Sequence, residues 1–120
     1  MQIRTVIWDL DGTIIDSMPL HYDAFADAFR IYDSGFVLEK RHYIEFILGE
    51  LSNADFFREL LPKISDRKAE ELAEKKASAF SDLIQNRGCK PLPGAIALIH
   101  RLSERGREQF LVSNSGGQER

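Results

Sequence analysis

The fold is decided by the segment Ile7-Trp8-Asp9-Leu10-Asp11-Gly12-Thr13-Ile14-Ile15-Asp16-Ser17. Its start belongs to a short, mostly apolar run that contains Ile3, Val6, Ile7 and Trp8. Such a run is typical of a strand that is buried on both faces of a parallel sheet. Because ligands bind outside the carboxyl ends of strands in open α/β sheets, the end of this strand places Asp9 for chemistry.

Two carboxylates, Asp9 and Asp11, lie one residue apart at this point. Side chains alternate along an extended chain, so both carboxylates can point to the same side. A phosphate monoester repels nucleophiles, and a carboxylate attacks it only where a metal ion and fixed donors neutralise its charge. The pair therefore predicts a phosphoryl-transfer site in which Asp9 forms an aspartyl-phosphate and Asp11 serves as acid and base.

A second strand is expected at Phe110-Leu111-Val112, followed by the polar, glycine-rich run 113–117. Residues 106–109, which come before this strand, are polar and less typical of a strand. The order of strand, polar tip and glycine turn in 110–117 repeats the order in the first segment. We expect the phosphoryl oxygens to be bound by small donors at both tips, namely Gly12, Thr13, Ser113 and Asn114.

The sequence between the two strands is helical in pattern from about Pro19 to about Asn86, which is too long for a single crossover. The first predicted helix has an apolar face made of His21, Phe25, Ala28, Phe29 and Tyr32. A short helix is expected at 41–48, a third opens at Ser52 with Asp55 as a capping box, and the longest opens at Ser65. After the rigid linker 91–94, a helix from Ala95 is stopped by Gly106.

The chain of 120 residues is one ordinary domain in length, with 43% apolar and 29% charged residues. The net charge is −3, and its Lys and Arg residues are scattered, so nucleic acid is not an expected partner. We find no stretch that is apolar enough for a signal peptide or a membrane span. Cys89 has no second cysteine to pair with, so we expect a cytoplasmic protein in which this thiol is incidental.

Two other interpretations of the first segment were weighed. Asp and Gly favour turns wherever they occur, so Asp-Leu-Asp-Gly alone could be a solvated turn. A calcium loop is excluded by spacing, because the sixth position from Asp9 is Ile14 rather than Gly and the twelfth is Leu20 rather than Glu. The longer string and the second tip favour the phosphoryl-transfer site.

The run Asp9-Leu10-Asp11-Gly12-Thr13 with Asp16-Ser17 resembles the first signature of the haloacid dehalogenase-like hydrolase superfamily. Val112-Ser113-Asn114 resembles its second signature, and Pro91-Leu92-Pro93-Gly94 is similar to the approach to that signature in the subgroup of β-phosphoglucomutase and small phosphatases. The resemblance implies a Rossmann-like α/β core, here with about two parallel strands, and a helical cap inserted after the first strand. The core would comprise residues 1–16 and 88–120, and the cap residues 17–87.

The resemblance also implies roles for individual residues. Asp9 would be nucleophile and Mg²⁺ ligand, Asp11 would be acid/base with its carbonyl on the metal, and Ser113 would bind phosphate. In the dehalogenases the position of Asp11 is typically tyrosine, and in the phosphonate hydrolases it is alanine. The expected activity is therefore that of a magnesium-dependent phosphatase of small phosphorylated metabolites.

Two alternatives concern the cap. A hexose-phosphate mutase would need an arginine to grip a second phosphate, and the loop from Gly49 to Ser52 has none; we interpret Arg41 and Arg58 nearby as solvated helix-face charges. This loop is where members of the subgroup select their substrates, which makes Gly49 and Ser52 candidate substrate residues. His21 is either a cap histidine that approaches the core or a helix-face residue that packs with Phe25.

Two further signatures of the superfamily, a lysine and a set of acidic metal ligands, are not found in the sequence. The 120 residues would then be a catalytically incomplete fragment, or a non-enzymatic binding remnant. A core of two strands leaves apolar surface uncovered, so we expect self-association, with Phe110 and Val112 exposed.

Overall fold

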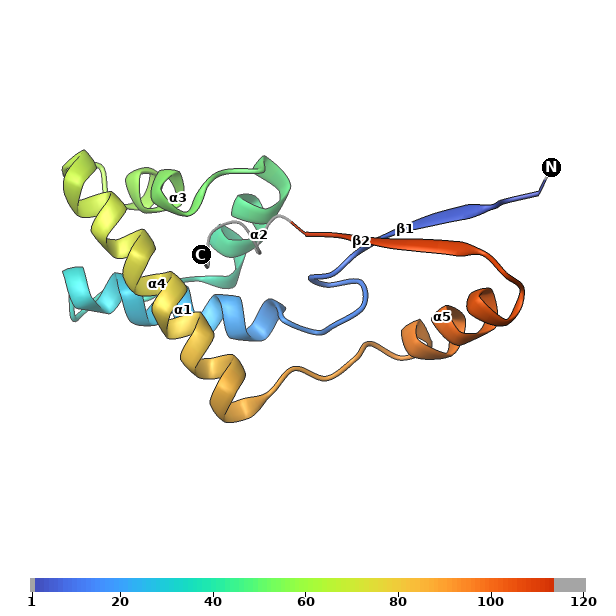
Figure 1. Ribbon diagram of the computed structural model, residues 1–120. Coiled ribbons are helices and arrows are strands. Elements are labelled where there is room, and N and C mark those ends of the chain that lie inside the picture. Colours follow the sequence, from blue (N-terminus) through green and yellow to red (C-terminus); the bar gives the residue numbers. More distant parts are fainter. Residues whose placement is uncertain (1, 114–120) are drawn as a thin grey trace. The chain divides into compact units, whose positions relative to one another are not determined.

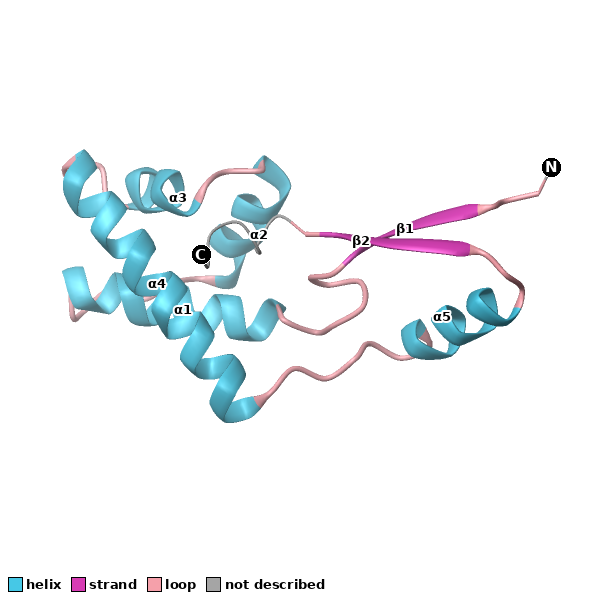
Figure 2. Cartoon of the chain, viewed as in Figure 1, coloured by secondary structure: helices cyan, strands magenta, loops and turns pink. Residues whose placement is uncertain are grey.

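The computed structural model describes residues 2–113, which form two strands and five helices (Figures 1 and 2). In chain order these are β1 (Thr5–Asp9), α1 (Met18–Tyr32), α2 (Lys40–Gly49), α3 (Asn53–Leu60), α4 (Asp66–Arg87), α5 (Ala95–Glu104) and β2 (Glu108–Val112). The chain divides into two compact units. One contains the strands and α5, and the other is the helical unit Leu20–Asn86. The predicted α/β class is confirmed.

The two strands of the first unit run parallel, and their register runs from Thr5 opposite Glu108 to Asp9 opposite Val112. β2 begins two residues earlier than the apolar run 110–112 predicts. The reason is Gln109, whose side chain accepts a hydrogen bond from Trp8 Nε1 at 2.8 Å and donates to the Ile99 carbonyl of α5 at 3.0 Å. A polar residue can therefore occupy this position because both ends of its amide are bonded.

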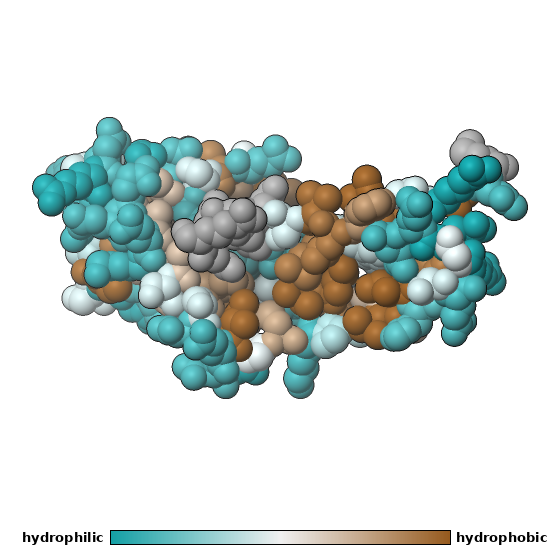
Figure 3. Space-filling view, viewed as in Figure 1, coloured by the Kyte–Doolittle hydropathy of each residue, from teal (hydrophilic) through white to brown (hydrophobic). Residues whose placement is uncertain are grey.

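The expectation that β1 is buried on both faces is wrong for the described residues. Its side chains alternate between half-buried and exposed positions, and Ile7 is 68% exposed. Exposure of Phe110 and Val112 is confirmed, at 56% for each. α5 packs on β2, and apolar surface gathers over the part of the chain that holds the strands (brown in Figure 3). The sheet therefore has one uncovered apolar face within residues 2–113.

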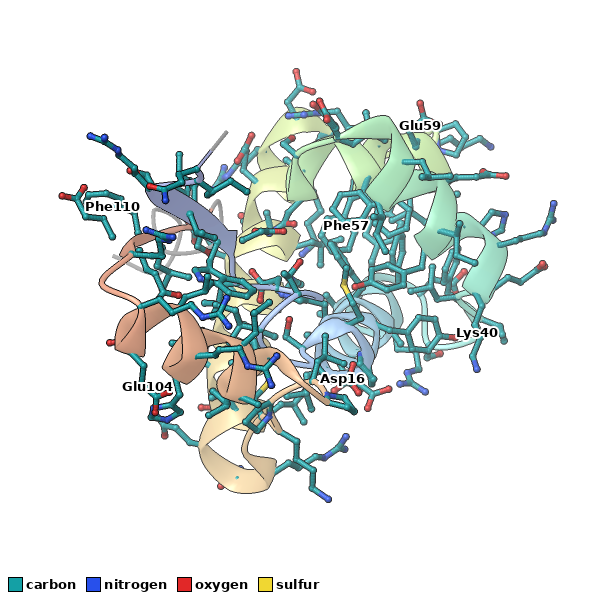
Figure 4. All side chains as sticks on the ribbon, turned by 90° about the vertical axis from the view of Figure 1, so that its right-hand side faces the viewer. Asp16, Lys40, Phe57, Glu59, Glu104 and Phe110 are labelled. Atoms are coloured by element: carbon teal, nitrogen blue, oxygen red, sulfur yellow. The ribbon has the colours of Figure 1, made fainter. Side chains whose placement is uncertain are left out.

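The core of the helical unit is a cluster of aromatic rings from α1 and α3. The ring centroids of Phe25 and Phe56 are 4.9 Å apart in an edge-to-face arrangement, and those of Phe29 and Phe57 are 4.6 Å apart. Figure 4 shows Phe57 among these rings, with Phe110 at the outside of the other unit. Such pairs add about 0.5–1.5 kcal/mol beyond their buried area. The predicted face of α1 is correct at its centre, whereas Tyr32 at its end is 39% exposed.

The helix starts follow the predicted capping residues. Ser52 Oγ accepts from the Asp55 amide at 3.1 Å, and Ser65 Oγ accepts from the Lys68 amide at 3.1 Å. The capping box at Ser52 is only half formed, because the Asp55 carboxylate accepts from Arg58 at 2.7 Å. A serine cap satisfies one of the amides that a helix start leaves without a partner.

Arg58 is more than a solvated charge. Besides Asp55, its guanidinium reaches Asp66 at 3.0 Å and Glu70 at 3.3 Å, so it joins α3 to the first turns of α4. Arg41 pairs with Glu39 at the exposed start of α2, as a helix-face charge would. In the described part of the chain, no helix has the length and apolar character needed to cross a membrane.

Candidate active site

The loop after β1 is tied to a single carbonyl group. The Leu10 oxygen accepts from the amides of Thr13, Ile14 and Ile15 at 3.3, 3.0 and 3.1 Å. Gly12 has φ of +74°, and a Cβ there would lie 3.3 Å from the Met18 side chain. A left-handed φ strains any side-chain-bearing residue, so the turn requires glycine. The loop is thus a compact turn with a defined backbone.

The segment predicted as a rigid linker also supports this loop. The Asp16 amide donates to the Lys90 carbonyl at 2.9 Å, and the Leu92 amide donates to the Ile14 carbonyl at 2.8 Å. Ile15 and Pro91 therefore form an antiparallel bridge. Residues far apart in sequence hold the loop in place beside the end of β1.

The two strand tips are neighbours. Asp9 is opposite Val112 in the register, so Ser113 follows directly beside the loop that starts at Leu10. Adjacent strands lie about 4.8 Å apart, which brings Asp9 and Ser113 to the same edge of the sheet. Thr13 is exposed on the loop between these tips and the linker. Asn114, a predicted phosphate-binding residue, lies outside the described residues.

The Asp9 side chain is exposed, and its Oδ1 accepts from the Leu10 amide at 2.9 Å. This bond orients the carboxylate at the end of β1. Asp11 is half-buried, and its Oδ1 accepts from Ser17 Oγ at 2.6 Å. The two carboxylates of the motif therefore have different surroundings, as two different chemical roles require.

Ser17 has a role that the sequence analysis missed. It is fully buried, at 0% exposure, and it is one of two buried polar or charged residues in the described chain. A buried hydroxyl must be hydrogen-bonded, and here the partner is Asp11. The signal was present in the sequence as Asp16-Ser17, but only the folded loop shows which carboxylate the hydroxyl meets.

Cys89 lies next to this loop, and its Sγ is 3.8 Å from the Asp16 carbonyl oxygen. Burial raises the pKa of its thiol, and the nearby carboxylates of Asp11 and Asp16 raise that pKa further. A thiolate is the reactive form of cysteine, so these surroundings do not suit a nucleophile.

The remaining predicted site residues belong to the helical unit. His21 lies on α1, Gly49 is the last residue of α2, and Ser52 is the N-cap of α3. Their part in substrate binding stays a prediction.

His21 packs on Phe80, with ring centroids 3.8 Å apart. Its Nδ1 lies 2.8 Å from Nζ of Lys76, which is only 5% exposed. The sequence analysis missed this lysine as a special residue. The signal was a lysine at an apolar position of the long helix, between Leu72 and Phe80.

The donors at the strand tip can be compared with the needs of a magnesium ion. The Asp9 carboxylate and the Asp11 carbonyl are oxygen donors, which Mg²⁺ prefers, and this ion often takes one or two carboxylates and completes its shell with phosphate and water. Among residues 2–113, no three His, Cys, Asp or Glu side chains cluster closely enough to hold a metal. The donors fit an ion that is shared with a phosphate group.

Comparison with known proteins identifies the family of the chain. A sequence model of the haloacid dehalogenase-like hydrolase family matches residues 3–117. The chain belongs to this family of hydrolases.

Solved structures of similar fold include the following three proteins. A mutant of CbbY from Rhodobacter sphaeroides in complex with xylulose-(1,5)bisphosphate is 17% identical, with a TM-score of 0.78 over 98% of this chain and 54% of that one. A family IA, variant 3 hydrolase from Entamoeba histolytica is 24% identical, with a TM-score of 0.75 over 98% and 52%. A hydrolase from Pseudomonas syringae is 27% identical, with a TM-score of 0.69 over 92% and 49%. The chain thus spans about half the length of these proteins.

Proposed function

We propose that the tips of β1 and β2 form the active site of a magnesium-dependent phosphatase that acts on small phosphorylated metabolites. The observation that carries the proposal is the meeting of Asp9 and Ser113 on adjacent strand ends, with Asp11 held by a buried hydroxyl. Family membership supports hydrolysis as the reaction class. The aspartate at position 11 supports phosphate esters as substrates.

In the first step, an oxygen of the Asp9 carboxylate attacks phosphorus while the bond from phosphorus to the leaving alcohol breaks. Protonated Asp11 gives its proton to the departing oxygen. Ser17 donates to Oδ1 of Asp11 and so orients the carboxyl group that carries this proton. Splitting the displacement in this way turns one difficult step into two easier ones.

In the second step, Asp11 is a carboxylate and takes a proton from water. The water oxygen attacks phosphorus, the aspartyl-phosphate bond breaks, and Asp9 is regenerated together with inorganic phosphate. Ser113 and the Thr13 hydroxyl would donate hydrogen bonds to the phosphoryl oxygens during both steps.

A magnesium ion would be held by the Asp9 carboxylate and the Asp11 carbonyl. When bound, it would neutralise part of the phosphate charge that repels the carboxylate. No cluster of three acidic, histidine or cysteine side chains lies in the described residues, so we expect weak magnesium binding in the absence of phosphate.

The helical unit Leu20–Asn86 is proposed to be the cap that selects the substrate. His21, Gly49 and Ser52 are its candidate contacts. The complex of CbbY with xylulose-(1,5)bisphosphate supports small sugar phosphates as the substrate class to examine first. No residue of the described loop 49–52 adds the arginine that would favour a mutase.

The proposal is tested with the protein expressed from its complete coding sequence. Hydrolysis of an aryl phosphate should require magnesium and should fall to background in Asp9→Asn. Asp11→Asn should lower turnover by about 10²–10⁴-fold, the usual contribution of a general acid and base. Turnover that survives Asp9→Asn would refute the assignment of the nucleophile.

The chain of residues 1–120 by itself is expected to turn over this substrate at least about 10²-fold more slowly. The physical reason is the small set of charge-stabilising groups in the described residues, since a single lost donor can cost this much. Equal activity of the two forms would show that residues 1–120 hold every group that the reaction needs.

A further inference from the structure

A pocket of about 330 Å³ opens in the unit that contains the strands, at the end of the sheet opposite to Asp9. It is lined by Arg4, Thr5, Gly106, Arg107 and Glu108. Both strands begin at this end, beside the turn that follows α5 (Figure 1). Four steps of about 3.3 Å along β1 separate Thr5 from Asp9 by roughly 13 Å, so this pocket is distinct from the candidate active site.

The strand register places two arginines side by side at this pocket. Thr5 is opposite Glu108, so Arg4 and Arg107, each one residue earlier, are neighbours at the start of the two strands. The Glu108 amide donates to the Arg4 carbonyl at 3.0 Å, so the hydrogen bonding between the two strands continues to Arg4. Like charges at neighbouring positions of adjacent strands destabilise a sheet. An anion between them would remove this repulsion.

The protein supplies little counter-charge here. Among residues 2–113, neither arginine side chain forms an ion pair or a hydrogen bond. Glu108 lines the same pocket, but its carboxylate does not pair with either of them. The three charged side chains of the lining therefore leave an excess of one positive charge.

The lining also suits a phosphate group, because guanidinium groups bind phosphate through parallel hydrogen bonds. Gly106 has φ of +70°, and a Cβ there would meet nothing within 4 Å, so the wall at this residue is open. The volume lies at the small end of the range for ligand sites, which suits one phosphoryl group on a small molecule.

We infer that this pocket is a second anion site, which binds the phosphate group of a small ligand through Arg4 and Arg107. The inference does not rest on the proposed function, because it uses neither Asp9 nor Asp11. The ligand is inorganic phosphate or a phosphoryl group carried by an organic molecule. At this end of the sheet, a bound anion could affect the protein without occupying the strand tips where the substrate is proposed to bind.

The test is a titration of the ¹⁵N-labelled chain, followed by amide NMR signals at constant ionic strength. Inorganic phosphate and methylphosphonate are added separately in exchange for chloride. We expect saturable shifts of the Thr5, Gly106 and Glu108 amides. Any shifts of Gly12 and Thr13 report on the strand tips and are fitted as a separate binding event.

Arg4→Ala and Arg107→Gln should each weaken the pocket event at least tenfold and leave the strand-tip event unchanged. Arg105→Ala is the matched control, because Arg105 is an exposed arginine next to Gly106 that does not line the pocket. The affinity of the Arg105→Ala variant for phosphate should equal that of the unmodified chain. Glu108→Gln should strengthen binding by removing the competing carboxylate.

Three results would overturn the inference. The first is that neither anion shifts the pocket amides. The second is that chloride alone shifts them equally. The third is that Arg105→Ala weakens phosphate binding as much as Arg4→Ala or Arg107→Gln. A dispersed spectrum of each variant shows that it is folded, so a lost response can be assigned to the site. Whichever of the two anions binds more tightly identifies the source of the phosphate group.

Discussion

Ser17 connects the proposed site to the fold, because its buried hydroxyl is hydrogen-bonded to Asp11. Ser17→Ala removes the hydroxyl that donates to Asp11 at 2.6 Å. We expect turnover of the aryl phosphate to fall, because Asp11 loses the orientation that both of its proton transfers require. The free energy of unfolding should fall by about 1 kcal/mol, the usual net value of one such hydrogen bond.

The control for this variant is Ser103→Ala, an exposed serine on α5. It should change neither turnover nor stability measurably. Equal turnover in Ser17→Ala and in the unmodified protein would show that the hydrogen bond to Asp11 has no part in the reaction.

Cys89 provides a reporter of the charge on Asp11. Burial is the largest cause of the raised pKa of its thiol, followed by the carboxylates of Asp11 and Asp16. The pH dependence of alkylation by iodoacetamide should therefore have its midpoint above that of the urea-unfolded chain. Asp11→Asn should lower the midpoint, since it removes one negative charge. A midpoint that does not move would contradict the placement of these groups.

The sign of the stability effect follows from the same pKa. A thiol whose pKa is raised by folding contributes stability that is fully present below the unfolded pKa. That contribution is lost as the pH rises through the folded pKa. The free energy of unfolding should therefore fall in the alkaline range, and Cys89→Ser should remove this part of the pH dependence.

Among the helices and strands, α3 depends on its capping residue. Ser52→Ala should lower the free energy of unfolding of the helical unit by about 1 kcal/mol, because one amide at the start of α3 loses its partner. Urea unfolding followed by circular dichroism measures this change. Ser52→Asp should keep most of the stability, because a carboxylate also caps a helix. Equal loss in both variants would mean that the cap bond is not the cause.

The elements were predictable where local chemistry determines them. Ser52 and Ser65 identified two helix starts, and the left-handed glycines Gly88 and Gly106 followed the ends of α4 and α5. The start of β2 was not predictable, because the place of Gln109 in a strand depends on Trp8, which is 101 residues away in sequence. Periodicity carries no information about such a partner.

The proposed site was predictable in position but not in its supporting contacts. The spacing of Asp9 and Asp11 at a strand end made them candidates, and the second tip added Ser113, which the strand register places beside Asp9. The hydroxyl of Ser17 and the buried ammonium of Lys76 were not predictable, because their importance lies in burial and in a specific partner. Neither property can be read from residue type alone.

For the whole molecule, two phenylalanines distinguish the buried core from exposed apolar surface. Phe57 is fully buried among aromatic rings, so Phe57→Ala should lower the free energy of unfolding by about 3–5 kcal/mol. Phe110 is 56% exposed, and Phe110→Ser should change stability far less. We expect Phe110→Ser to reduce self-association of the chain, measured by sedimentation velocity. Unchanged association would show that this face of the sheet is not the contact.

The burial of β1 depends on the layers that surround the sheet. An apolar run predicts burial on both faces when the sheet has layers on both sides, and in residues 2–113 only one face of the two strands is covered. How far a strand is buried depends on what surrounds it in the whole molecule. The apolar run therefore predicted the strand correctly and its burial wrongly.

The central claim is that Asp9 is the nucleophile of a phosphoryl-transfer site. The most direct test incubates the protein from its complete coding sequence with magnesium and acetyl phosphate, and locates the phosphoryl adduct by peptide mass spectrometry. We predict an adduct on Asp9 that accumulates further in Asp11→Asn, where hydrolysis is slow, and that is absent in Asp9→Asn. An adduct on another residue, or labelling of Asp9 no greater than in the urea-unfolded protein, would contradict the claim.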